Sequence, residues 1–175
     1  MEKVNAELVT LTYGTIVAQL CKDYNSDYAE VNKQLDKMGY NIGMRLIEDF
    51  LAKSSTGSCS NLRETAEMIS KVGFKMFLNI TPAITNWSAD NKSFTLVFEE
   101  NPLADFVELP DDGKAQDELW YSNILCGVLR GALEMVRHNR QEGYFRQLAD
   151  AVFRCKCKSR LSSRVTYCAE MIRRR

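Results

Sequence analysis

The feature that most constrains the fold is a long, nearly uncharged run, Leu119–Val136, which only one arginine and one glutamate interrupt. A helix built from this run has apolar residues on almost every side, so we expect it to be buried nearly all round. It is too short and too interrupted to cross a bilayer. Gly127 and Gly131 would stack on one face and admit a second backbone, of this chain or of an oligomer partner. We therefore predict a central core helix; a buried strand around Trp120–Ile124 leading into a helix is the alternative.

Composition indicates one folded domain. The chain has 175 residues, 45% of them hydrophobic and 26% charged, which is ordinary for a folded protein of this size. Because the sequence opens on polar residues, no signal peptide is expected. Its six cysteines are too widely spread to form a disulfide-built scaffold, so a reducing, cytoplasmic compartment is expected.

Charge is unevenly distributed along the chain. Residues 137–175 hold eleven Lys/Arg and three Asp/Glu, a net charge of +8, which leaves −8 for the remainder. A basic end of this kind can mark an acidic or membrane-facing partner. A solvated arginine-rich tail explains the same pattern, and the sequence leaves both readings open.

Three helices are predicted before the central one. Apolar residues at helical spacing indicate helices at about 6–24 and 28–52, and a third from Leu62 to Ile80. Asp27-x-x-Glu30 and Asn61-x-x-Glu64 have the spacing of capping boxes at the second and third helix starts. Residues 54–60 read as a loop, and Pro82 is expected to stop the third helix.

The remaining pattern predicts an α+β domain with an antiparallel sheet and helices on one face. Alternation predicts a strand at Phe94–Phe98, and Phe106–Leu109 is expected to form a second. Two further strands are expected within residues 144–157 and 164–172, joined near 159–163. A helix over 144–153 remains an alternative for the first of these.

Catalytic and metal sites are not expected. His138 is the only histidine, and the chain has no P-loop, GxGxxG or HExxH motif. Cys155 and Cys157 with Cys168 lack both the usual spacing and the fourth ligand of a structural zinc site.

Cys59 is the exception among the cysteines. It lies in a loop just before a predicted helix N-terminus, where free N–H groups favour a thiolate, with Arg63 adding to this and Glu64 opposing it. The helix behind it has an apolar stripe with a gap at Gly73. A thiol beside an apolar groove could hold a fatty acyl thioester; an ordinary loop cysteine is the alternative.

At this point the chain resembles a known family, the bet-three-type small subunits of TRAPP, the transport protein particle. The resemblance covers about residues 8–136 and rests on long strings, not on a short motif. They are LTYGTIVAQLCKDY, VNKQLDKMGYNIGMRLIEDFLA, GFKMFLNITPAITNW, NPLADFVELP and YSNILCGVLRGALEMV.

The resemblance implies a single domain, 1–175, of helices against a four-stranded antiparallel sheet. It also implies a subunit of a vesicle-tethering complex, pairing with other small TRAPP subunits or with itself, peripheral on cis-Golgi and ER-Golgi membranes. The assembled complex would act as nucleotide exchange factor for a Rab-one-type GTPase, and the subunit alone would not be an enzyme. No nucleic-acid partner is implied.

The resemblance further implies a covalently bound, palmitate-like acyl chain on Cys59. The chain would lie in an internal tunnel lined by Ile69, Gly73 and Met76, as part of the core rather than as a membrane anchor. Gly73 stands where relatives have alanine.

The sequence departs from the family pattern in two places, and both affect what the resemblance implies. Ser58 stands where relatives have arginine. From Arg137 the sequence no longer follows the family, so 137–175 is an atypical basic region to which a Rab-contacting role is not carried over. A changed tail could leave a strand unpaired and expose a sheet edge.

Two alternatives to the scaffold subunit remain. One is a stand-alone module that binds lipid or a small ligand, and the other is an enzyme acting through Cys59, for which no general base is visible.

Overall fold

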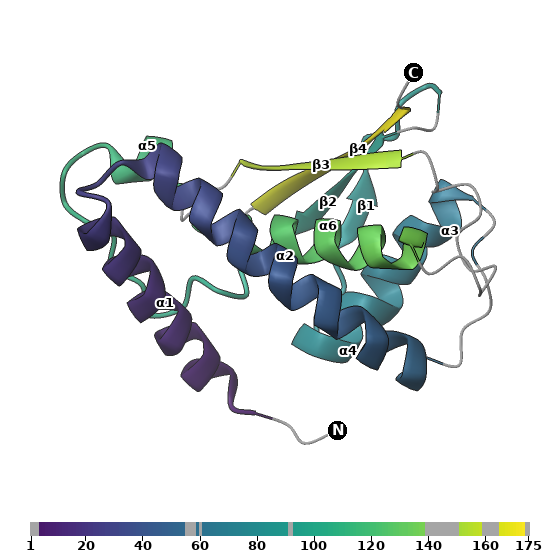
Figure 1. Ribbon diagram of the computed structural model, residues 1–175, viewed down its shortest axis with the longest axis horizontal. Helices are drawn as coiled ribbons and strands as arrows, with labels where there is room; N and C mark the ends of the chain where they lie inside the picture. Colours follow the sequence, from purple (N-terminus) through teal and green to yellow (C-terminus); the bar gives the residue numbers. More distant parts are fainter. Residues whose placement is uncertain are drawn as a thin grey trace.

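The computed structural model describes residues 4–54, 59, 61–90, 93–138, 151–158 and 165–173, and from residue 137 onward it describes the backbone alone. The helical elements are α1 (Ala6–Asp23), α2 (Tyr28–Lys53), α3 (Leu62–Glu67), the π-helix η1 (Met68–Gly73), α4 (Phe74–Leu78), α5 (Ala115–Glu118) and α6 (Asn123–His138). The strands are β1 (Ala83–Thr85), β2 (Ser93–Phe98), β3 (Ala151–Lys158) and β4 (Val165–Arg173). Figure 1 shows α2 and α6 side by side near the centre, with α1 on the outside.

Both predicted helix starts are capped by the first residue of the expected capping box, while the Glu64 carboxylate accepts from the Asn61 side-chain amide at 2.8 Å. The Asp27 carboxylate accepts from the Glu30 N–H at 3.2 Å, and the Asn61 side chain accepts from the Glu64 N–H at 2.8 Å. Each contact satisfies one of the free N–H groups of a first helical turn. These caps fix where α2 and α3 begin, and so where the loop carrying Cys59 ends.

Four glycines bring α2 and α6 into direct backbone contact. A Cβ added at Gly39 would lie 2.0 Å from the Ile124 carbonyl oxygen, and one at Gly43 would lie 2.1 Å from that of Val128. In the other direction, Gly127 and Gly131 each face a backbone carbonyl of α2, at 2.1 and 2.2 Å from an added Cβ. The close packing predicted from the glycine spacing is therefore within the chain, and these faces are not available to an oligomer partner.

Polar side chains hold the same two helices together at the edge of the seam. The Arg130 guanidinium donates to the Asp36 carboxylate and lies over the Tyr40 ring, 4.6 Å from its centroid. The Tyr40 hydroxyl donates to Glu134 at 2.7 Å. All four side chains are on α2 or α6, so their contacts fix how the two helices are positioned along each other. The glycines allow the helices to approach closely.

The central helix begins later than the sequence predicts. Residues 119–122 form a turn, neither helix nor strand, and α6 starts at Asn123. The buried Asn32 side chain of α2 accounts for this: its oxygen accepts from the Trp120 N–H at 2.8 Å and its amide donates to the Glu118 carbonyl at 2.9 Å. Leu119 has an extended backbone at φ −83° and ψ 119°, and residues 119–122 pair with no strand in the described part of the chain, so both the earlier start and the strand alternative were wrong.

The third predicted helix is not one regular helix. Its middle is the π-helix η1, in which the Phe74 N–H donates to the Ile69 carbonyl, five residues back. The buried Ser70 hydroxyl donates to the Pro82 carbonyl at 2.5 Å, which ties this segment to the start of β1. The helix ends at Leu78, before the predicted Ile80, because Asn79 adopts a left-handed conformation at φ 56°.

The strands form one antiparallel sheet in the order β1-β2-β4-β3. The predicted class, helices with a small antiparallel sheet, is confirmed. β4 pairs with β2 from Ser93↔Glu170 to Phe98↔Val165 and with β3 along its other side. The tail backbone thus covers β2, contrary to the expectation that a changed tail could leave a strand unpaired. Residues 139–150, which hold most of the alternative helix, lie outside the described residues.

The strand predicted at Phe106–Leu109 does not form. The Val107 N–H donates to the Ala104 carbonyl in a turn, and Phe106 has φ 63° with 72% of its surface exposed. A bulky residue in the left-handed region breaks the extended backbone that a ladder needs. Instead β1, three residues long and directly after Pro82, pairs with β2.

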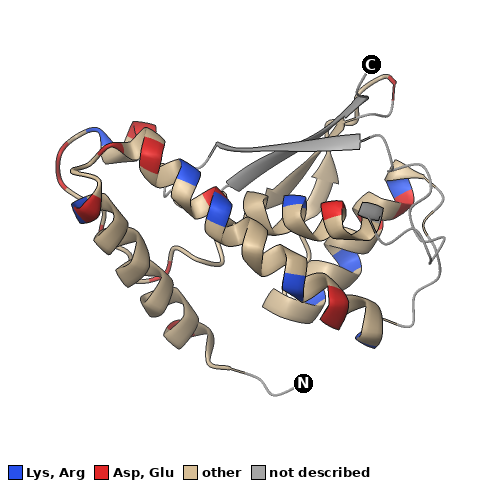
Figure 2. Cartoon of the chain, in the orientation of Figure 1, with Lys and Arg blue, Asp and Glu red and all other residues tan. Residues whose placement is uncertain are grey.

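Acidic side chains gather at one end of the molecule, where α5 approaches the start of α2 (Figure 2). There the Tyr28 hydroxyl donates to the Asp112 carboxylate. Burial, together with this hydrogen bond, raises the pKa of Tyr28 to about 12, and the same bond lowers the pKa of Asp112. This end carries part of the negative charge that the sequence assigns to residues before 137.

Candidate functional site

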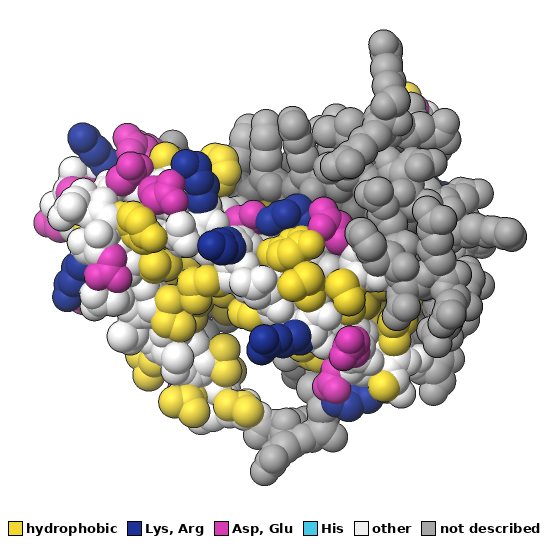
Figure 3. Space-filling view, in the orientation of Figure 1, with side chains coloured by type: hydrophobic (Ala, Val, Ile, Leu, Met, Phe, Trp, Pro, Cys, Tyr) yellow, Lys and Arg dark blue, Asp and Glu magenta, His cyan; other side chains and the backbone are white. Residues whose placement is uncertain are grey.

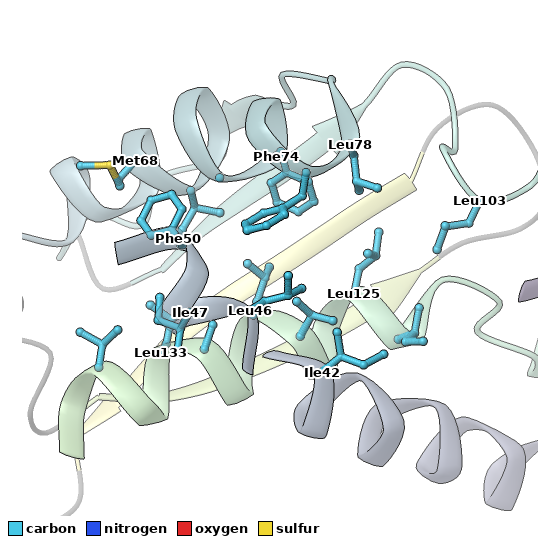
Figure 4. Close-up of a pocket in the computed structure, with 18 of the residues that line it drawn as sticks. Ile42, Leu46, Ile47, Phe50, Met68, Phe74, Leu78, Leu103, Leu125 and Leu133 are labelled. Atoms are coloured by element: carbon cyan, nitrogen blue, oxygen red, sulfur yellow. The ribbon is translucent and has the colours of Figure 1, made fainter. Parts of the chain in front are cut away.

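An apolar cavity of about 420 Å³ lies between α2, α6 and the α3–η1–α4 segment (Figure 4). It is lined by Val9, Tyr13, Ile42, Leu46, Ile47, Phe50, Thr65, Met68, Ile69, Gly73, Phe74, Phe77, Leu78, Leu103, Ile124, Leu125, Val128, Leu129, Ala132, Leu133 and Val136. None of these residues is charged. A cavity of this size and lining suits a long aliphatic ligand, because its described walls carry no charged side chain that could bind a charged or strongly polar group.

The π-helix decides which side chains of this segment face the cavity. Ile69 and Gly73 line it, but the predicted Met76 does not. A purely α-helical stripe would carry the wall from residue 69 through 73 to 76. The wider π turn adds a residue, so that after Gly73 the wall continues through Phe74, Phe77 and Leu78. The prediction of Met76 was wrong because the sequence gives no sign of this change of period.

Gly73 leaves space in the wall. A Cβ placed there would lie 3.8 Å from the Met68 carbonyl oxygen and 4.0 Å from the Phe50 ring, which is ordinary contact. Its backbone is ordinary helix, at φ −61° and ψ −61°. Neither conformation nor close backbone approach requires glycine here, so its effect is to widen the cavity beside Phe50.

Cys59 is buried at the edge of this cavity. Only 5% of its surface is exposed, and although it is not itself a lining residue, it is hydrogen-bonded with the side chain of Thr65, which is one. Cys59 therefore lies beside Thr65, which is on the helical segment that also contributes Ile69 and Gly73 to the cavity wall.

The thiol is not activated in the way that the sequence suggested. Burial raises the pKa of Cys59, Glu64 raises it further, and the hydrogen bond with Thr65 acts weakly in the opposite direction. Arg63 lies over the Trp87 ring instead, 5.4 Å from its centroid. The prediction that the helix start and Arg63 favour the thiolate was wrong, because burial is the largest influence on the pKa of Cys59 and raises it.

The structure adds no other chemical site to the described part of the chain. Among the described residues no group of three or more His, Cys, Asp or Glu could hold a metal ion. The side chains of His138, Cys155, Cys157 and Cys168 lie outside the described residues. In the same described part, no helix has the length and apolar character to cross a membrane.

Sequence reasoning missed the lining residues that come from α1 and from the loop after β2. Val9 and Tyr13 of the first helix and Leu103 of that loop all line the cavity. The apolar stripe of the first helix includes Val9 and Tyr13, so the signal that they face inward was present. Hydrophobic periodicity indicates that a side chain faces inward, but not whether it faces the cavity or another part of the core.

Comparison with known proteins identifies relatives over most of the chain. The sequence profile of the transport protein particle (TRAPP) component family matches residues 9–159. The "Trafficking protein particle complex subunit BET3" of Saccharomyces cerevisiae is 64% identical over 136 residues, 78% of this chain and 69% of that protein. The "Transport protein particle subunit bet3" of Schizosaccharomyces pombe is 59% identical over 148 residues, 85% of this chain and 79% of its own length.

A solved structure shares the fold over nearly the whole chain. It is a trafficking protein particle complex subunit 3 from Naegleria fowleri, described as covalently bound to palmitic acid. The two chains are 45% identical with a TM-score of 0.82, over 99% of this chain and all of the other. The family profile continues to residue 159, past residue 136, where the sequence strings of the family resemblance end.

Proposed function

This chain belongs to the TRAPP component family, and we propose that it serves as a small subunit of a trafficking particle complex, with a fatty acyl chain bound through Cys59 inside the cavity. The observation that carries the proposal is an apolar cavity of about 420 Å³ whose wall includes Thr65, the hydrogen-bonding neighbour of Cys59. The palmitic acid named for the Naegleria relative supports the class of acyl group.

The chain's own residues have two tasks in this proposal. The Cys59 sulfur attacks the thioester carbonyl of an acyl-coenzyme A; a new carbon–sulfur bond forms, the old one breaks, and the thiol proton leaves with coenzyme A. The apolar side chains along α2, α6 and α4 then exclude water. When bound, the acyl group supplies hydrocarbon that completes the core.

Two independent estimates give the scale of this stabilisation. Burying about a dozen methylenes at ~0.8 kcal/mol each gives roughly 10 kcal/mol. Leaving the cavity of about 420 Å³ empty costs, at ~24 cal/mol per Å³, about 10 kcal/mol as an upper bound. Both figures apply to a chain held inside the protein, so the proposal predicts a lipid that stabilises the fold.

The test is the mass of protein purified from a eukaryotic host. We expect an increment on the peptide containing Cys59, which neutral hydroxylamine removes and which Cys59→Ser lacks. Cys21→Ser is the matched control, since Cys21 is also free and buried and should leave the adduct in place. An unmodified Cys59 in such protein contradicts the acyl part of the proposal.

The surface of α1 supports the subunit part. Leu8 and Leu11 are 59% and 52% exposed, and Figure 3 shows hydrophobic side chains along this helix. We propose that this face contacts another small subunit or a second copy of the chain. A pull-down with mass spectrometry should recover other small TRAPP subunits, and Leu8→Glu with Leu11→Glu should lose them while the protein stays folded. A stable monomer that exchanges its lipid reversibly would instead indicate a stand-alone lipid-binding module.

Within the assembled complex the subunit acts as a scaffold without catalytic residues of its own. We propose that the complex lies peripherally on ER and Golgi membranes and accelerates nucleotide exchange on a Rab-one-type GTPase. The measurement is nucleotide release from the GTPase with the complex, with the complex lacking this subunit, and with the subunit alone. Only the first should accelerate release; activity of the isolated subunit would contradict the scaffold role.

A further inference from the structure

The cavity has two distinct ends. Figure 4 places Met68 and Phe50 toward one end and Leu103 and Ile42 toward the other. Cys59 adjoins the first end through Thr65. A chain attached to the sulfur therefore runs away from α3, and its methyl terminus approaches the second end.

From this geometry we infer that the far end at Leu103, together with Tyr13 of α1, which lines the cavity and is anchored to the same turn before α6, is a fixed stop that sets the length of the acyl chain the protein accepts. The inference rests on the proposed function, since it concerns the chain held by Cys59. It assigns a role in specificity to residues outside the Cys59 loop and the helix behind it.

Tyr13 is held in place by two contacts. Its hydroxyl donates to the Tyr121 carbonyl, and its ring meets the Tyr121 ring edge to face, with centroids 5.1 Å apart and an interplanar angle of 74°. It is a buried residue whose ring lines the cavity. A tyrosine fixed at both its ring and its hydroxyl cannot swing aside for a longer ligand without losing the hydrogen bond.

Leu103 is held through its backbone to the same turn. Its N–H donates to the Asn101 side-chain oxygen at 3.1 Å, and that oxygen also accepts from the Ser122 hydroxyl at 2.9 Å. Leu103 and Tyr13 are thus both anchored to residues 121–122, immediately before α6. The far wall is one connected unit, so it resists outward displacement as a unit.

One wall of the cavity is long enough for a chain of about the palmitoyl length. From Thr65 to Leu78 this helical wall extends by about 20 Å at most, at ~1.5 Å per residue. An extended palmitoyl chain has a similar length. Each methylene that meets a rigid apolar wall changes selectivity by about 10- to 200-fold, so a fixed stop predicts a sharp upper limit.

The experiment compares acyl chain lengths on matched variants. Purified full-length protein, first stripped of any adduct with hydroxylamine, is incubated with lauroyl-, myristoyl-, palmitoyl- or stearoyl-coenzyme A, and the adduct on Cys59 is measured by intact mass. Leu103→Ala opens the far end, and Leu133→Ala removes the same atoms from a similarly buried lining residue toward the other end of α6. Tyr13→Phe keeps the ring and removes the hydroxyl.

We expect the wild type to take stearoyl at least about tenfold less than palmitoyl. Leu103→Ala should raise the stearoyl-to-palmitoyl ratio about tenfold, and Tyr13→Phe, which frees the ring from its hydrogen bond, should raise it to a smaller extent, while Leu133→Ala leaves it within about twofold. Equal ratios for Leu103→Ala and Leu133→Ala would overturn the inference, because total volume would then be what matters. Leu103→Val and Leu133→Val replace the pair if melting shows that either alanine variant is unfolded.

The two possible failures are distinguishable. If the wild type takes no acyl group of any length on Cys59, the proposed function itself fails. If it takes acyl groups with no dependence on chain length, or with a dependence that the Leu103 variants leave unchanged, only the far-end stop is refuted.

Discussion

Replacing Gly39 by alanine tests the packing that creates the cavity's walls. The new Cβ would lie 2.0 Å from the Ile124 carbonyl oxygen and 2.9 Å from its carbon, and both are backbone atoms of α6. Neither can rotate away, so α2 and α6 must separate by an ångström or more. The whole seam of four glycines and the cavity-lining residues on both helices would move with them.

The expected cost follows from two opposed effects. Overpacking costs about 1–3 kcal/mol and sometimes more, and a rigid backbone places this case at the upper end. Alanine regains about 1 kcal/mol of helix propensity over glycine. We expect a net loss of at least about 2 kcal/mol, which lowers the melting temperature by about 4–8 °C in a chain of this size.

The matched control is the same substitution at Gly73. There the nearest atom to the new Cβ is at 3.8 Å and the backbone is helical, so alanine introduces no clash. We expect Gly73→Ala to leave stability unchanged or raise it by up to about 1 kcal/mol. Urea unfolding of both variants, in the same acylation state, measures the difference. Equal stabilities for the two variants would refute the argument from backbone contact.

Four further predictions concern the site. Gly73→Leu should lower the yield of the Cys59 adduct at least about tenfold without unfolding the protein, because the side chain enters space that the acyl chain needs; intact mass and melting measure both, and an undiminished adduct would contradict the route past Gly73. Because burial raises the pKa of Cys59, its acylation rate should rise about tenfold per pH unit from pH 7 to 8.5 with no plateau; a plateau below pH 8 would show a thiolate stabilised by the fold. Glu64→Gln removes a charge that raises this pKa, so it should increase the rate at pH 8. Removing the acyl chain with hydroxylamine should lower the melting temperature by at least about 6 °C, since even a third of the cavity's estimated contribution exceeds 3 kcal/mol; an unchanged melting temperature would argue against an internal chain.

The part of the fold that the sequence predicts is the part encoded in local spacing. Glycines four apart on two helices indicated close backbone contact, and Gly39 and Gly127 do meet carbonyls of the opposite helix. The capping residues Asp27 and Asn61 stand where their side-chain chemistry predicts. These features depend on neighbours in the chain, so pattern reasoning reaches them.

The errors arise where distant contacts override the local pattern. The Asn32 side chain accepts from the Trp120 N–H, just before α6, where the sequence predicted helix. The π turn shifts the cavity wall from Met76 to Phe77 and Leu78. Cys59 is a similar case. A helix start favours a thiolate, but the burial that raises the pKa of Cys59 depends on segments distant in the sequence. None of these partners can be identified from spacing alone.

The central claim is that the cavity holds a chain attached to Cys59. The most direct measurement is an experimental structure, by crystallography, of the protein purified from a eukaryotic host. The account predicts continuous density from the Cys59 sulfur past Gly73 toward Leu103, between α2, α6 and α4. A free thiol beside a cavity filled by repacked side chains would contradict it.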